Sequence, residues 1–246
     1  MIIVGNDIVD LQSESASGKS SDLRFMRRVF TASERKSIEN HKNPDKALWL
    51  HWASKEAAYK VVCKLQKPRP VFSHAQFVVD LKKSVELGLF SNIVHATVKF
   101  RAITLEVQFE AGPDFIHAIA YWPFGSGLDE FEIHSGSRAT SSADLSLWSD
   151  RGWLESNFTE DELLSCVRSE SALVRYFSKK SIADQIKYNE SRIQIIRPQI
   201  PDNYQPPYLL VDGRRSEVDV SLSHHGRFVA WAYSTRRPDS INVMRF

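Results

Sequence analysis

The chain has 246 residues, 42% of them hydrophobic, and its formal net charge is +2 at pH 7. That length can bury one large core or two small ones, and so small a net charge gives no support for a nucleic-acid partner. Cys63 and Cys166 are its two cysteines, and neither belongs to a CxxC motif or a His/Cys cluster. A disulfide framework and a structural zinc site are therefore not expected.

The N-terminus begins with an apolar run, Ile2-Ile3-Val4, which predicts a buried strand. Gly5 and Asn6 are expected to end this strand and to leave Asp7 at its end. Asp7 and Asp10 also interrupt the run, which argues against a secretory signal. No apolar stretch approaches the roughly 18 residues of a membrane-spanning helix. We expect a cytoplasmic protein with no membrane partner.

Helices are predicted over residues 33–40 and 47–65, the second of which contains no Gly or Pro. Within it Trp52, Glu56 and Lys60 recur every four residues and lie along one stripe. Asp7, Glu56 and Lys60 together could hold a divalent cation and a polyphosphate, since Mg²⁺ is typically bound by one or two carboxylates, waters and substrate phosphates. The alternatives are an ordinary surface ion pair between Glu56 and Lys60, and a turn-capping role for Asp7.

Three segments in order resemble the 4'-phosphopantetheinyl transferases, and in particular the small holo-acyl-carrier-protein synthase type. They are Gly-Asn-Asp-Ile-Val at residues 5–9, Arg-Val-Phe-Thr-Ala-Ser-Glu at residues 28–34, and Trp-Ala-Ser-Lys-Glu-Ala-Ala-Tyr-Lys at residues 52–60. The resemblance is strong over residues 1–62 and thin beyond them.

The resemblance implies transfer of 4'-phosphopantetheine from coenzyme A, the co-substrate, to a serine of an acyl, peptidyl or polyketide carrier protein. It implies that Asp7 and Glu56 hold Mg²⁺, that Lys60 neutralises a phosphate, and that Glu56 or a metal-bound water accepts the serine proton. Asp10 is a candidate for supporting the metal ligands, because Val9 fills the position where some relatives carry a third acid. A carrier protein is typically acidic, so the docking face is expected at Arg24, Arg27 and Arg28.

Two other classes of function stay open. The chain could be a catalytically inactive module that binds carrier proteins with the same fold. It could also bind nucleic acid through basic segments such as Lys82-Lys83 and Arg236-Arg237, although no recognition motif supports this and charge runs are usually solvated surfaces.

The chain also contains an internal repeat, which would let one chain supply both sides of a site. Residues 30–34, 47–52 and 116–121 recur at residues 158–162, 172–177 and 228–233, with offsets of 158 − 30 = 128, 172 − 47 = 125 and 228 − 116 = 112. In this alignment Ser181 corresponds to Glu56 and Gln185 to Lys60. The second half therefore lacks the acidic motif.

The second half has Ser221-Leu222-Ser223-His224 instead, before an apolar strand at residues 228–233. The resemblance implies that Ser223 and His224 contact the coenzyme A nucleotide, and His225 is expected to face the other way because strand residues alternate. Without that context His224 would be an ordinary strand-end histidine.

We therefore predict an α+β fold of two similar halves related by a pseudo-twofold axis, acting as a monomer with one site at the interface. The first half is residues 1–124, the linker residues 125–143 and the second half residues 144–246. Strands are expected at residues 76–81, 98–109 and 131–134, and helices within residues 161–187.

Overall fold

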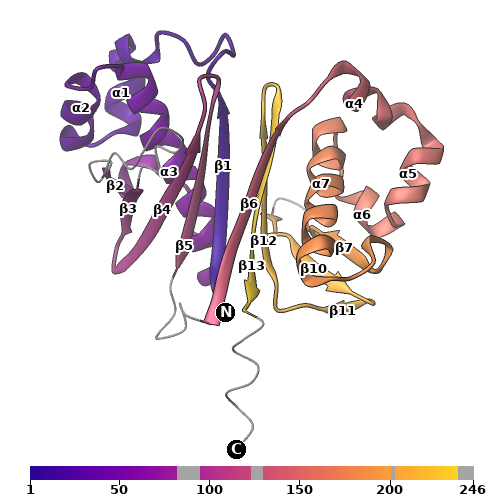
Figure 1. Cartoon of the computed structure of the whole chain (residues 1–246). Helices are drawn as coiled ribbons and strands as arrows, with labels where there is room; N and C mark the ends of the chain where they lie inside the picture. The colour runs from indigo at the N-terminus through magenta and orange to yellow at the C-terminus, as the bar shows by residue number, and fades with distance from the viewer. Residues whose placement is uncertain (82–94, 123–129, 201–202, 238–246) are drawn as a thin grey trace, which may run out of the picture. The chain divides into compact units, whose positions relative to one another are not determined.

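The computed structural model describes residues 1–81, 95–122, 130–200 and 203–237. Contacts divide the chain into two compact units. The first unit is Gly5–Trp122, and the second unit is Pro123–Phe246 together with Met1–Val4. Both units combine helices with antiparallel sheet (Figure 1), so the predicted α+β class is confirmed. The basic segment Lys82-Lys83 and residues 125–129 of the predicted linker lie outside the residues that the structure describes.

The first unit is built on a five-stranded sheet in the order β1-β5-β4-β3-β2. These strands are β1 (Ile3–Asp10), β2 (Val78–Leu81), β3 (His95–Phe100), β4 (Ile103–Ala111) and β5 (Phe115–Trp122). On β3 and β4 every second side chain is buried, as a sheet covered on one face requires. The long helix α3 (Pro44–Leu65) supplies that cover (Figure 1).

Sequence signals at the helix starts explain where the helices of this unit begin. Asp22 caps α1 (Leu23–Val29), and Asn43 caps α3 with Pro44 in its first turn. Thr31 and Glu34 form a capping box at the start of α2 (Ala32–Glu39). The described part of this unit also contains the short 3₁₀ turns η1 (Lys19–Ser21) and η2 (His74–Gln76).

Two sequence predictions about strands were wrong. β1 does not stop at Gly5 and Asn6 but continues to Asp10, which places Asp7 inside the strand. Residues 98–109 are not one strand but parts of β3 and β4, joined by a two-residue turn in which Arg101 has φ 54°. No glycine marks that turn, so the sequence pattern did not reveal it.

Gly5 has a packing role rather than a strand-breaking one. A Cβ atom at this position would lie 2.2 Å from the Ala57 carbonyl oxygen and 2.9 Å from the Val61 Cγ2 atom. The backbone of β1 therefore lies directly on the backbone of α3, at the turn of the helix between Glu56 and Lys60. No side chain larger than hydrogen fits between them.

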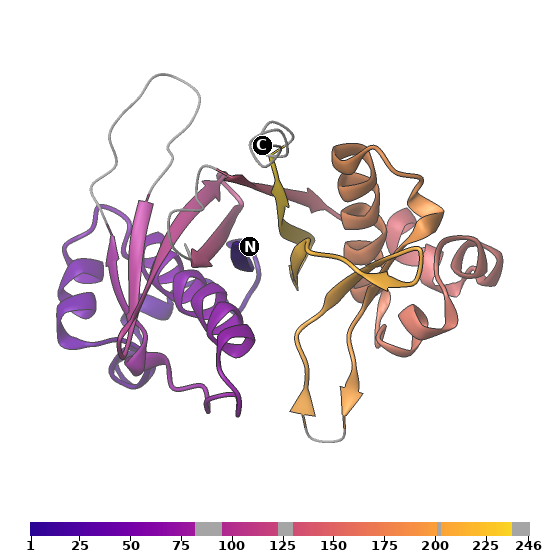
Figure 2. The same ribbon diagram turned by 90° about the horizontal axis from the view of Figure 1, so that it is seen from below.

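The second unit contains two three-stranded sheets, in the orders β12-β13-β6 and β11-β10-β7, and a short pair β8–β9 that extends away from the helices (Figure 2). α7 packs against both three-stranded sheets. The strands are β6 (Phe131–Ala139), β7 (Ile193–Ile196), β8 (Gln199–Ile200), β9 (Asn203–Tyr204), β10 (Tyr208–Val211), β11 (Arg214–Arg215), β12 (Asp219–His225) and β13 (Phe228–Arg236). The helices are α4 (Ser142–Ser146), α5 (Arg151–Asn157), α6 (Glu160–Leu164) and α7 (Ser169–Ile186), with 3₁₀ turns η4 (Leu147–Ser149) and η5 (Glu190–Arg192).

Two further boundaries differ from the sequence predictions. The strand expected at residues 131–134 continues to Ala139, so part of the Gly/Ser-rich segment assigned to a linker is strand β6. β6 runs through Gly136, where a Cβ would meet the Trp231 ring, so this glycine makes room for a side chain. The helical stretch 161–187 is broken after Leu164 and resumes at Ser169.

The same buried ion pair occurs once in each unit. In the first unit Lys55 Nζ lies 2.8 Å from Glu34 Oε1, and Glu34 also accepts the backbone N–H groups of Thr31 and Val79. In the second, Lys179 Nζ lies 3.2 Å from Glu162 Oε2. Glu162 likewise accepts the N–H groups of Thr159, in a capping box, and of Ile195, on β7.

These matching contacts correct the register of the repeat. Lys55 corresponds to Lys179, an offset of 179 − 55 = 124. At the same offset, His51 bonds the Ala47 carbonyl as Arg175 bonds the Ser171 carbonyl. The sequence alignment, which used 125, was therefore one residue out in this helix. Lys180, not Ser181, corresponds to Glu56, and Asp184, not Gln185, corresponds to Lys60.

We expect Gly5→Ala to destabilise the first unit by about 1–3 kcal/mol, because the added methyl group must push β1 away from α3. Calorimetry should show a lower melting temperature for the transition of this unit. Gly152→Ala is the matched control, since its Cβ would meet only Asp150 Oδ1 at 3.4 Å on helix α5. An unchanged melting temperature for Gly5→Ala would contradict the close approach.

We expect Lys55→Met to cost about 3–5 kcal/mol, because it leaves the buried Glu34 carboxylate without its cation. The double variant with Glu34→Gln should lose less than the sum of the single changes, since the two residues act as one unit. Urea unfolding measures both. Lys36→Met, at an exposed position of α2, is the control. Additive losses would show that the pair is not coupled.

Candidate functional site

The structure brings Asp7, Glu56 and Lys60 together in the first unit. Asp7 comes from β1, and the other two come from α3. Lys60 Nζ lies 3.4 Å from Asp7 Oδ1 and donates a hydrogen bond of 2.6 Å to the main-chain oxygen of Asn6. The side chains of Asp7, Glu56 and Lys60 are 17%, 24% and 32% exposed, so each is partly buried but open to a ligand.

The electrostatics of this cluster favour a bound cation. Burial raises the pKa of Asp7 to about 7; Lys60 acts to lower it, and the nearby Glu56 carboxylate raises it further. Two carboxylates that repel each other in a partly buried place lose that repulsion when a divalent cation lies between them. One lysine neutralises only part of their charge.

The donor set fits a cation that is shared with a substrate rather than fully enclosed. Among the residues that the structure describes, no group of three or more His, Cys, Asp and Glu side chains is placed to hold a metal. Two carboxylates with the remaining positions left to phosphate and water are what Mg²⁺ typically uses at a phosphate substrate. Asp7 and Glu56 are therefore the residues that could hold it.

Asp10 does not support the metal ligands as expected. It lies three residues after Asp7 on β1, so its side chain points to the opposite face of the strand. The Asp10 carboxylate is buried and accepts the backbone N–H of Gln12 at 3.0 Å. Its role is to close the turn that follows the strand.

A buried contact on that opposite face fixes the backbone beside Asp7. The Asn6 amide nitrogen lies 3.0 Å from His117 Nε2 on β5, and both side chains are fully buried. Burial lowers the pKa of His117, so the ring is neutral and its Nε2 can accept the amide N–H. Asn6 is thus held by β5 on one side and by Lys60 on the other.

Sequence reasoning missed His74, which contacts the cluster from the loop after α3. His74 Nε2 lies 3.4 Å from Glu56 Oε1. The ring contacts those of Trp52 and Phe72 at centroid distances of 4.4 and 4.1 Å, tilted by 31° and 42°. No spacing in the sequence links residue 74 to Glu56, because the contact depends on how the loop folds back onto the helix.

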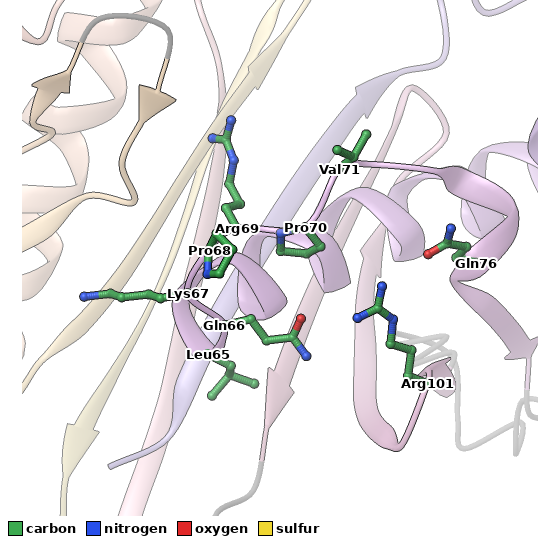
Figure 3. Close-up of a pocket in the computed structure, with 9 residues that line it drawn as sticks. All are labelled: Leu65, Gln66, Lys67, Pro68, Arg69, Pro70, Val71, Gln76 and Arg101. Atoms are coloured by element: carbon green, nitrogen blue, oxygen red, sulfur yellow. The ribbon is translucent and has the colours of Figure 1, made fainter.

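A pocket of about 700 Å³ begins at the end of α3, five residues after Lys60 (Figure 3). Its charged lining residues are all cationic, namely Lys67, Arg69 and Arg101. Gln66 points toward Arg101, while Lys67 and Arg69 extend to the other side of the loop (Figure 3). The other lining residues are Leu65, Pro68, Pro70, Val71 and Gln76. Such a lining favours an anionic ligand.

Comparison with protein-family models matched residues 3–120 to the 4'-phosphopantetheinyl transferase superfamily. The match is just under half of the chain and includes Asp7, Glu56, Lys60 and His74. The first unit of the chain is therefore similar to this superfamily over almost its whole length. No curated protein and no solved structure matched it.

The transferase match ends within β5, and the second unit has no acidic cluster at the corresponding place. At the corrected register Lys180 and Asp184 stand where the first unit has Glu56 and Lys60, so both charges are reversed. Lys180 Nζ lies 4.4 Å from the Tyr176 ring centroid on the same helix. The acidic residues that could hold a cation thus come from the first unit.

Ser223 and His224 lie on β12 of the second unit, but on opposite faces of the strand. Val220 and Leu222, which alternate with His224, pack into a core cluster with Ile182 of α7. Ser223 is 6% exposed and lies on the face that His225 shares. Their predicted contact with the nucleotide stays a prediction, and it requires the ligand to reach two faces at the end of this strand.

Arg24, Arg27 and Arg28 are exposed on α1, as the docking prediction requires. The ring of Phe25 on the same helix stacks on Trp52, with 5.5 Å between ring centroids. Because Trp52 lies one helical turn before Glu56, α1 is beside the acidic cluster. Within the described ranges, no helix is both long and apolar enough to cross a membrane.

Proposed function

We propose that this protein transfers the 4'-phosphopantetheine group of coenzyme A to a serine hydroxyl of a carrier protein, producing holo-carrier protein and 3',5'-ADP. The observation that carries the proposal is the meeting of Asp7, Glu56 and Lys60 inside the region that matches the superfamily. Two carboxylates and a lysine are the groups that such a phosphoryl transfer needs at the pyrophosphate.

Each residue has a distinct task in the proposed reaction. Asp7 and Glu56 would hold Mg²⁺, which when bound offsets charge on the pyrophosphate and improves 3',5'-ADP as a leaving group. Lys60, a compact cation held at the Asn6 carbonyl, would neutralise a phosphate oxygen as its charge develops. Glu56, or a water molecule near it, would accept the serine proton. The serine oxygen then bonds to the phosphorus that carries pantetheine, and the bond from that phosphorus to the 3',5'-ADP oxygen breaks.

One feature of the first unit supports a large anionic co-substrate. The cationic pocket at residues 65–71 starts about 7.5 Å beyond Lys60 along the helix axis, at 1.5 Å per residue. Phosphate groups of coenzyme A would fit its lysine and arginines.

We also propose that one chain acts alone, as a monomer, on an acyl, peptidyl or polyketide carrier protein.

The central test is incubation with coenzyme A, Mg²⁺ and an apo-carrier protein, followed by mass spectrometry of the carrier protein. The wild type should add one phosphopantetheine group, and EDTA should prevent the addition. Asp7→Ala and Glu56→Ala should each abolish transfer while leaving the melting temperature near its normal value. Glu39→Ala, an exposed acid at the end of α2, is the control.

The outcome separates this proposal from its main alternative. A protein that binds carrier proteins but adds no mass, at any Mg²⁺ concentration, is the inactive binding module. Near-normal turnover by either acidic variant at saturating Mg²⁺ would remove that residue from the ligand set.

The exposed arginines of α1 generate a separate prediction about the carrier protein. Arg24→Glu with Arg27→Glu should raise KM for the carrier protein and leave coenzyme A affinity nearly unchanged. Rim charges act mainly on association and are screened by salt, so the defect should shrink as ionic strength rises. Steady-state kinetics at low and high salt measure this.

The matched control is Lys36→Glu with Lys42→Glu, which makes the same charge change at exposed positions of the first unit outside α1. Equal effects of the two double variants would mean that net charge, rather than the α1 surface, sets the affinity.

A further inference from the structure

His74 is held in one orientation by contacts of its ring with two aromatic rings and through its main chain. The imidazole centroid lies 4.4 Å from that of the Trp52 ring and 4.1 Å from that of Phe72, with interplanar angles of 31° and 42°. Lys55 Nζ donates a hydrogen bond of 3.0 Å to the His74 carbonyl oxygen. The imidazole therefore has little freedom to turn.

The contacts continue beyond these neighbours into a column of rings, which are tilted at His74 and stacked at the two ends of the column. Phe25 lies on the far side of Trp52, and Tyr59 lies on the far side of Phe72, with centroid distances of 5.5 and 4.3 Å. Trp52 is four residues before Glu56 and Tyr59 three residues after it, so the two helix members of the column flank Glu56 on its own side of α3. The column links α1, α3 and the loop after α3 beside the Glu56 carboxylate.

The nitrogen of His74 that faces Glu56 has no other partner. Nε2 is buried and makes no hydrogen bond within the described residues, and Glu56 Oε1 is 3.4 Å from it. A buried ring nitrogen without a hydrogen bond is costly, so this arrangement needs a reason. A shift of a few tenths of an ångström by the carboxylate would complete a normal N–H···O bond.

We propose that His74 is a positioning residue for Glu56: its Nε2–H donates to Oε1 and leaves Oε2 for the divalent cation. This inference rests on the proposed function, in which Glu56 and Asp7 hold that cation. Residues that bond a metal ligand in this way fix its direction, and their loss typically lowers metal affinity by about 10–100-fold. The ring column holds the imidazole at the distance from Glu56 that this hydrogen bond requires.

The test uses Mn²⁺ as a substitute for Mg²⁺, because free Mn²⁺ is measured directly by electron paramagnetic resonance. Titrations of the full chain are made with coenzyme A present, for the wild type, Asp7→Asn, His74→Phe, His74→Gln and His95→Phe. His74→Phe keeps an aromatic ring but lacks the nitrogen. His95→Phe makes the same change at an exposed position of β3.

We expect His74→Phe to weaken Mn²⁺ binding by at least about tenfold and His95→Phe to leave it unchanged. His74→Gln should recover part of the affinity, because the glutamine amide N–H extends about as far from Cα as Nε2 does, even though ring stacking is lost. In transfer assays, extra Mg²⁺ should restore much of kcat in His74→Phe but not in Asp7→Asn.

Failure of this inference is distinguishable from failure of the proposed function. If the wild type binds Mn²⁺, Asp7→Asn loses it and His74→Phe binds as well as the wild type, only the role of His74 is overturned. The same conclusion follows if His74→Gln is as weak as His74→Phe while both keep the wild-type melting temperature. If the wild type binds no Mn²⁺ with coenzyme A, the role of His74 and the proposed function are both overturned.

Discussion

The close contact between β1 and α3 at Gly5 is the constraint on which the candidate site depends. With a Cβ position only 2.2 Å from the Ala57 carbonyl, the strand and the helix touch through their backbones. This brings Asp7 and Lys60, fifty-three positions apart in the chain, to 3.4 Å. An added side chain at residue 5 would separate the strand from the helix, and the distance between the two charged groups would grow with it.

The helix is fixed on a second side by the residue before Glu56. Lys55 is fully buried against Glu34, and the same ammonium group donates to the carbonyl of His74. One lysine therefore connects α2, α3 and the loop that carries His74. Successive helical residues point about 100° apart. The Glu56 side chain therefore points between the side of α3 on which Lys55 lies and the side that contacts Gly5. The position of Glu56 therefore follows from two rigid contacts, those of Lys55 and Gly5, and neither residue takes part in the proposed chemistry.

The second unit shows that this framework does not depend on the chemistry it carries. It repeats the capping box, the buried Glu–Lys pair and the backbone N–H bond to the next strand, with Glu162, Lys179 and Ile195. Yet at the positions of Glu56 and Lys60 it has Lys180 and Asp184. A fold supports different surfaces as long as the residues that fix its helices are kept.

Most of the first unit could be predicted from the sequence where local signals agree. The long helix follows from its caps and from the lack of Gly and Pro, and the three motifs in order lie inside the region that matches the superfamily. The errors have a common cause in long-range packing. Gly5 looked like a strand breaker because nothing local shows that a helix lies against it, and the register of the repeat was one residue out because apolar residues alone align equally well in two ways.

His74 could not be predicted at all, because its place depends on ring stacking between a helix and a loop. The cluster that it adjoins is costly to the folded chain without a ligand, since burial and Glu56 together raise the pKa of Asp7 to about 7. Lys60 offsets only part of that cost. Groups arranged against their own electrostatic preference usually lie at sites of function, where a ligand supplies the missing charge. The same packing at Gly5, Lys55 and the ring column that makes the first unit stable also prevents the two carboxylates from moving apart.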